Sequence, residues 1–137
     1  MAAIVQLQAN KILDLTLGTS APTMFTTPAK VRLTTTTPTN TTAGTELTGS
    51  GYTTGGTSLS GNTFSAAATG ATTGPATTAL SWTNASGGTW SIVGVEIWDS
   101  AGTPLRWWYG VFTGQPVSVA NGNTFQIAVS ALSVSLT

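Results

Sequence analysis

The sequence predicts an all-β protein, a β-sandwich of jelly-roll or immunoglobulin-like type with a short N-terminal helix. Three observations support this prediction: many short apolar runs, turn residues at regular spacing between them, and abundant β-branched Thr. About seven short strands separated by regular turns are typical of sandwiches. We divide the chain into a helical arm over residues 1–20 and a single sandwich domain over residues 21–137.

The helix is predicted over residues 4–17. Its apolar residues do not alternate as they would in a strand, and Gly18 stands where a left-handed C-cap belongs. This helix is very apolar for a lone surface helix, so it must pack on a sheet or on a neighbouring chain.

The next segment contains one clear strand and a long loop. Residues 30–36 alternate as a strand, and β-branched residues of the Thr-rich stretch 34–48 favour extended backbone. Pro38 and Gly44 interrupt that stretch, so we expect the strand to end, a long loop to follow, and a new strand to start near Glu46.

Residues 49–76 are rich in Gly, Ser, Thr and Ala, with few large side chains. This composition is compatible with disorder as well as with thin strands that pack on a partner. We favour ordered strands near 52–59 and 62–67.

The following segment predicts two long strands joined as a hairpin. A strand ending at Trp82 precedes turn residues 84–88, and residues 90–98 form a strand with apolar side chains on both faces. The turn signal 99–102 then leads to the returning hairpin arm, residues 105–112.

The last segment predicts a further hairpin and a bend. Asn121-Gly122 is a strong hairpin turn dipeptide between strands at 117–119 and 125–129. Residues 132–136 alternate again, but their phase is shifted by one residue. Since such a shift exchanges the two faces of a strand, we expect a bulge or bend near Ser130-Ala131.

The side-chain chemistry argues against an enzyme. The chain carries four cations and four carboxylates, with no His and no Cys. Catalytic triads, thiolate metal sites and nucleic-acid surfaces therefore lack their usual residues. We predict no catalytic residue, no metal site and no cofactor. No segment has the length or pattern of a membrane span or a targeting signal.

Glu96 and Asp99 are the nearest approach to a carboxylate pair. Paired carboxylates would be needed for glycoside hydrolysis, but the two residues lie across a strand end and a turn. We interpret Glu96 as a solvated side chain and Asp99 as a turn former.

The zero net charge favours self-association, because nothing repels a second copy. Within the expected hairpin, Trp107 and Tyr109 should share one face of the strand and Trp108 the other. Three interpretations stay open for this cluster: core packing on both faces, an interface with another subunit, or stacking on a sugar ring.

The order of several segments resembles small tailed-bacteriophage virion structural proteins labelled head-decoration or tail fibre proteins. The segments that support this resemblance are 10–14 with Gly18, 27–33, 44–52, 89–99 and 117–137. The resemblance implies a virion component with no catalytic residues.

Our main hypothesis is a non-enzymatic capsid decoration protein that stabilises the head through subunit interfaces. Its expected partners are the major capsid protein and copies of itself, with a trimer as the candidate assembly, and neither nucleic acid nor membrane. The expected contact residues are Ile4, Leu7, Ile12, Leu13, Trp107, Trp108 and Tyr109. The alternative is a tail fibre or minor tail protein that touches the host surface or glycans. In both cases the protein is made in the host cytoplasm and acts in the virion.

Overall fold

The structure, a computed structural model, describes residues 3–18 and 25–135. Within these ranges the chain has one helix and strands in antiparallel ladders, so the predicted all-β class with a short N-terminal helix is confirmed. The predicted domain boundary at residue 20 and the predicted strand residue Leu136 lie outside the described residues. The elements are β1 (Ala3–Ile4), α1 (Gln6–Leu17), β2 (Lys30–Thr34), β3 (Thr57–Ser58), β4 (Ala71–Gly74), β5 (Leu80–Thr83), β6 (Trp90–Ile92), β7 (Gly94–Trp98), β8 (Arg106–Val111), β9 (Val117–Val119), β10 (Thr124–Ile127) and β11 (Leu132–Ser135).

The centre of the molecule is a five-stranded sheet with the order β1-β8-β7-β2-β3. The predicted hairpin is confirmed, since β7 and β8 pair antiparallel around the turn that begins at Asp99. Residues 94–97 of β7 are buried on both faces, as predicted for the apolar Val95 and Ile97. The core lies on one face of this sheet, and the Thr-rich loop after β2 covers part of the other.

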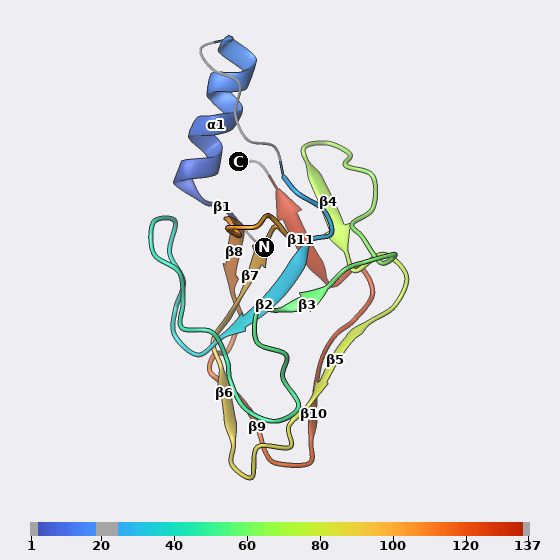
Figure 1. Ribbon diagram of the computed structural model, residues 1–137. Coiled ribbons are helices and arrows are strands. Elements are labelled where there is room, and N and C mark those ends of the chain that lie inside the picture. The colour runs from blue at the N-terminus through green and yellow to red at the C-terminus, as the bar shows by residue number, and fades with distance from the viewer. Residues whose placement is uncertain (1–2, 19–24, 136–137) are drawn as a thin grey trace.

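The strands from β4 to β11 pair in a nested order. β4 pairs with β11, β5 with β10, β6 with β9, and β7 with β8. This is the pairing of one long double-stranded ribbon that turns back on itself at the β7–β8 hairpin. In Figure 1 the β5–β10 and β6–β9 ladders form the end of the molecule opposite α1.

The strand predicted over residues 90–98 is broken at Val93, which corrects the prediction. The Val93 N–H donates to the Thr34 carbonyl at 2.8 Å, and the Val93 carbonyl accepts the Phe112 N–H at 3.0 Å. Gly94 follows, where a Cβ atom would lie 2.6 Å from the Gly110 carbonyl oxygen. The chain thereby leaves the β6–β9 ladder and enters the central sheet. The apolar run in the sequence does not show where this change occurs.

The bend expected near Ser130-Ala131 is confirmed. The C-terminal alternating segment is divided into β10 and β11, and Ser130 between them has a φ of 60°. The Ser130 N–H donates to the Pro75 carbonyl at 3.0 Å. The partner segment between β4 and β5 therefore bends at the same point of the ribbon, at residues 76–78. The phase shift in the sequence therefore marks a real change of strand direction.

The hairpin expected at Asn121-Gly122 is wrong, although the turn exists. Gly122 has the positive φ that such a turn needs, 86°. The flanking strands, however, pair with β6 and β5 and not with each other. The neighbouring turn after β5 holds this connection in place through the buried Asn84, whose amide donates to the carbonyls of Gly88 and Val119 at 2.8 and 2.7 Å.

The Gly- and Thr-rich middle of the chain departs most from the prediction. Of the strand expected near 52–59 only β3 is present, and residues 62–67 form no strand. The ladder strand is β4, which the sequence reasoning missed because Ala, Thr and Gly carry no alternating pattern. The strand expected over 30–36 ends at Thr34, and Glu46 forms a single bridge to that residue.

The helix begins two residues later than expected, because Ile4 belongs to β1 and pairs with Trp108. Its predicted end is confirmed, since Gly18 has a φ of 69° and its N–H caps the carbonyls of Asp14 and Leu15. Figure 1 shows α1 extending away from the β body, and Gln8 is its one buried residue. Of the two expected kinds of packing, the described chain does not provide the one on a sheet, and packing on a neighbouring chain stays a prediction.

We expect Asn84→Ala to lower the free energy of unfolding by about 2–3 kcal/mol, because each buried hydrogen bond that it removes contributes about 1 kcal/mol. Urea unfolding measures the change. Asn123→Ala, at an exposed position in the adjoining turn, is the matched control and should change stability by less than about 0.5 kcal/mol. Equal losses in the two variants would contradict the role of Asn84.

Candidate interaction surface

The helix contributes the exposed members of the expected contact set. Leu7 and Leu13 are each 57% exposed, while Ile12 and Ile4 are half-buried. Leu17 is 74% exposed and Leu15 is also exposed, so apolar side chains lie on more than one side of the helix. A helix that is apolar on several sides is normally covered by other protein.

The aromatic cluster is arranged differently from a regular strand. Ile97 pairs with Trp108 and Trp98 pairs with Arg106, so Trp107 is the extra residue of a β-bulge. The bulge places Arg106 and Tyr109 on the outer face of the central sheet and Trp108 on the face that packs against the core. The prediction that Trp107 and Tyr109 share one face of the strand is therefore wrong. Side chains alternate between the two faces of a strand only where no bulge inserts an extra residue.

Trp107 itself is part of the core, as the packing interpretation expects. It is 6% exposed, and its indole N–H donates to Asp99 Oδ2 at 3.2 Å. Asp99 also accepts the N–H groups of Ala101 and Leu105, which confirms it as a turn former. Phe25 packs against the Trp107 ring at a centroid distance of 5.4 Å. A contact of Trp107 with another chain stays a prediction.

A buried ion pair lies on the outer face of the central sheet. Glu96 Oε1 is 2.8 Å from an Arg106 guanidinium nitrogen, and Glu96 is 1% exposed. The interpretation of Glu96 as a solvated side chain is therefore wrong. The same carboxylate accepts the Gly44 N–H and the Trp98 indole N–H, both at 2.9 Å, and Arg106 donates to the Thr42 carbonyl at 2.8 Å. These bonds fasten the Thr-rich loop over the sheet.

A second polar cluster continues this face toward β3. The Arg32 guanidinium lies over the Trp98 ring at 4.0 Å and 3.8 Å from Glu46. The Tyr52 hydroxyl donates to Glu46 at 3.0 Å and accepts the Leu33 N–H at 3.2 Å. Burial raises the pKa of Tyr52 above its ordinary value. The carboxylates of Glu46, Glu96 and Asp99 are thus occupied by structural bonds.

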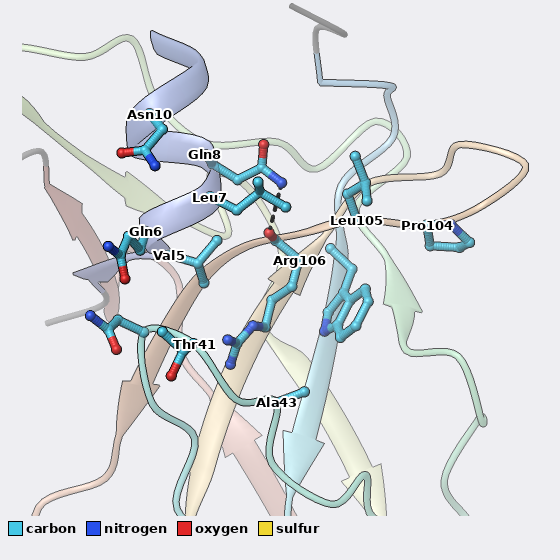
Figure 2. A pocket seen from close by; sticks show the side chains of 12 residues that line it. Val5, Gln6, Leu7, Gln8, Asn10, Thr41, Ala43, Pro104, Leu105 and Arg106 are labelled. Atoms are coloured by element: carbon cyan, nitrogen blue, oxygen red, sulfur yellow. Dashed lines mark hydrogen bonds between the residues drawn. The ribbon is translucent and has the colours of Figure 1, made fainter. Parts of the chain in front are cut away.

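A pocket of about 510 Å³ opens where the base of α1 meets the Thr-rich loop and the end of β7; we call it the helix-base pocket. Figure 2 shows the side chains of the first helical turn on one side of it and those of Pro104, Leu105 and Arg106 on the other. The fully buried Gln8 donates to the Arg106 carbonyl at 3.2 Å, which ties the helix to β8. Sequence reasoning missed this residue because a polar side chain on a helix is usually exposed.

The described residues that line the helix-base pocket include no His, Cys, Asp or Glu. Among residues 3–18 and 25–135, no group of three or more potential metal ligands occurs. Its one cationic side chain, Arg106, is already paired with Glu96. What remains is an aromatic edge from Trp98 with amide and hydroxyl groups from Gln6, Asn10, Asn40 and Thr41, which can form hydrogen bonds with a ligand.

A comparison with protein families identifies the family of this chain. Residues 3–135 match the model of the family described as Podophage GP4 fiber I protein gp80. The chain belongs to this fibre family. No curated protein and no solved structure matches it. The resemblance to phage virion structural proteins is thus confirmed.

Membership of the fibre family changes the balance between our two hypotheses. It supports the alternative, a tail fibre, better than capsid decoration. It also supports a place in the virion for this fibre-family protein. In the part of the chain that the structure describes, no helix is long and apolar enough to cross a membrane.

We expect Arg106→Met to destabilise this fibre-family protein by about 3–5 kcal/mol, because it leaves the buried Glu96 carboxylate without its counter-charge. The double variant Arg106→Met/Glu96→Leu should recover most of that loss. Urea unfolding of the two variants provides the comparison.

Arg32→Met is the matched control, because its ion pair with Glu46 is longer and more exposed and so contributes less. A loss for Arg106→Met no larger than for Arg32→Met would show that the Glu96–Arg106 pair does not hold the loop.

Proposed function

We propose that this chain is a non-enzymatic building block of a podophage fibre and is held in the virion by contacts between protein chains. The family match over residues 3–135 is the observation that carries this proposal, since it includes both the helix and the β body. The occupied carboxylates and the exposed leucines of α1 support it. Its proposed partners are copies of the same chain, with a trimer as the candidate assembly.

Capsid decoration, with the major capsid protein as partner, is the less supported reading. Neutral charge and an apolar helix suit any assembly and do not distinguish a head from a fibre. Synthesis in the host cytoplasm likewise stays an expectation. For the fold, we propose that the nested ribbon is rolled as a jelly roll, because the pairing of β4–β7 with β11–β8 supports that order over the immunoglobulin-like one.

Immunogold labelling of purified virions with antibodies raised against the full chain tests the location. We expect gold particles on fibres and none distributed over the capsid shell. Labelling spread evenly over the shell would overturn the fibre proposal and favour decoration. Virions lacking the protein serve as the control.

The second candidate function, binding of a neutral saccharide, rests on the helix-base pocket. Its volume is within the usual range for ligand sites. The edge of Trp98 offers an apolar surface, and the amides of Asn10 and Asn40 can both donate to and accept from sugar hydroxyls. Since Glu96 neutralises Arg106, the pocket offers no free charge for an acidic sugar.

Calorimetric titration of the full chain with neutral and acidic oligosaccharides from the host surface tests this candidate. We expect the neutral set to bind, with a loss of at least about tenfold in affinity for Asn40→Ala because a hydrogen-bond pair is removed. Asn123→Ala is the control, because this exposed residue lies in the turn between β9 and β10 and does not line the pocket. It should leave the affinity unchanged. Absence of binding, or equal effects of both substitutions, would contradict a saccharide site here.

A further inference from the structure

The turn between β9 and β10 contains the one Asn-Gly step of the sequence, Asn121-Gly122. Every other Asn in the chain is followed by Lys, Thr or Ala. Because Gly has no Cβ atom, its backbone nitrogen can approach the side-chain amide of the preceding residue more closely than that of any other residue type. Both residues of the step are exposed to water. Asn121 is therefore the Asn of this chain whose side chain is chemically most labile.

The reaction open to an Asn-Gly step is loss of ammonia through a succinimide ring. The Gly122 nitrogen gives up its proton to the solvent and bonds to the Cγ atom of Asn121. The bond from Cγ to Nδ2 breaks, and ammonia leaves with a proton taken from water. Water then adds to one of the ring carbonyl carbons and opens the ring, which gives either Asp or isoaspartate. In isoaspartate the backbone runs through the former side chain. The reaction consumes water and needs no oxidant or cofactor.

In the folded chain both reacting groups are engaged by the turn that follows β5. The Gly122 N–H donates to the Asn84 carbonyl at 2.7 Å. The side-chain Oδ1 atom of Asn121 accepts the Gly87 N–H at 2.9 Å. A third bond, from the Asn84 N–H to the Asn123 carbonyl at 2.9 Å, holds the two turns together. Ring closure needs a free Gly122 nitrogen and an Asn121 amide turned toward it, so the first two bonds must break before the reaction can start.

The buried side chain of Asn84 maintains this contact between the turns. Its amide nitrogen donates to the carbonyls of Gly88 and Val119, and its Oδ1 atom accepts the N–H and the hydroxyl of Ser86 at 2.9 and 2.7 Å. These bonds fix the turn after β5 against β9. They thereby keep its carbonyl and N–H groups directed at the Asn-Gly step. Opening of that step is thus coupled to the contacts of Asn84.

We propose that Asn121 is a deamidation site that the folded turn keeps unreactive and that local opening of the two turns exposes. The reaction replaces an amide by a carboxylate, so the neutral chain gains a negative charge on an exposed turn. Isoaspartate also adds a methylene group to the backbone, which no longer matches the turn bond from the Asn123 N–H to the Ala120 carbonyl. Conversion is therefore a one-way record of turn opening at the end of the molecule opposite α1 (Figure 1).

Incubation of the full-length chain at mildly alkaline pH tests the site, with fragment mass spectra that locate the product. We expect residue 121 to deamidate at least about tenfold faster in guanidinium chloride than in the folded chain at equal ionic strength, because the closed turn engages both reacting groups. Asn121→Gln, whose longer side chain does not close this ring, is the control and should give no product at that position. Equal rates in the folded and unfolded chain, or an unfolded chain that reacts faster at another Asn or not at all, would overturn the proposal.

The role of Asn84 is tested in folded variants. Asn84→Ala should deamidate at residue 121 at least about tenfold faster than the unchanged chain, because it loses the buried bonds that position the turn. Leu132→Ala is the control, because this buried residue lies on β11 and its truncation leaves a destabilising cavity away from the two turns. It should accelerate the reaction far less. Urea unfolding establishes that both variants are folded under the conditions of the assay.

A milder variant covers the case in which Asn84→Ala does not fold. Ser86→Ala, at an exposed position, removes one hydroxyl bond to Asn84 and should give a smaller acceleration in the same direction. If Leu132→Ala accelerates deamidation as much as the variants of the turn, the reaction follows global unfolding, and the proposed coupling to Asn84 is refuted.

Discussion

The buried ion pair between Glu96 and Arg106 is the contact on which the arrangement of the outer face depends. It joins β7 to β8, and through Gly44 and Thr42 it fastens the long Thr-rich loop to the sheet. A buried carboxylate and guanidinium are costly to desolvate, so they persist only with their remaining hydrogen bonds satisfied. The loop supplies those bonds, and in return it covers a sheet face that would otherwise be open to water.

Strand β8, which carries Arg106, also positions the base of the helix. The Arg106 backbone carbonyl accepts the Gln8 amide, and the Val5 N–H donates to the Trp107 carbonyl. The helix-base pocket is bounded by these residues and by the loop that the ion pair holds. The stability of the fold is thus linked to the helix-base pocket and to the exposed leucines, because α1 closes one side of the pocket and also carries these leucines.

The scarcity of charge has two physical effects. Every carboxylate on the β body is used inside the fold, so the surface is solvated by hydroxyl and amide groups and carries little that could repel a neighbour. Meanwhile, four of the six exposed large hydrophobic side chains among the described residues lie on α1. A surface of this kind suits a protein that works in contact with others, which agrees with its membership of the fibre family.

The sequence alone determined the class of the fold, the helix end at Gly18, the β7–β8 hairpin, the bend at Ser130 and the absence of His and Cys chemistry. Those features depend on periodicity and on residues with restricted backbone preferences, which act locally. The tertiary structure alone decided the break at Val93, the pairing of β4, the bulge at Trp107 and the burial of Glu96 and Gln8. Each of these depends on which distant segment supplies a hydrogen-bond partner, and local patterns carry no record of that choice.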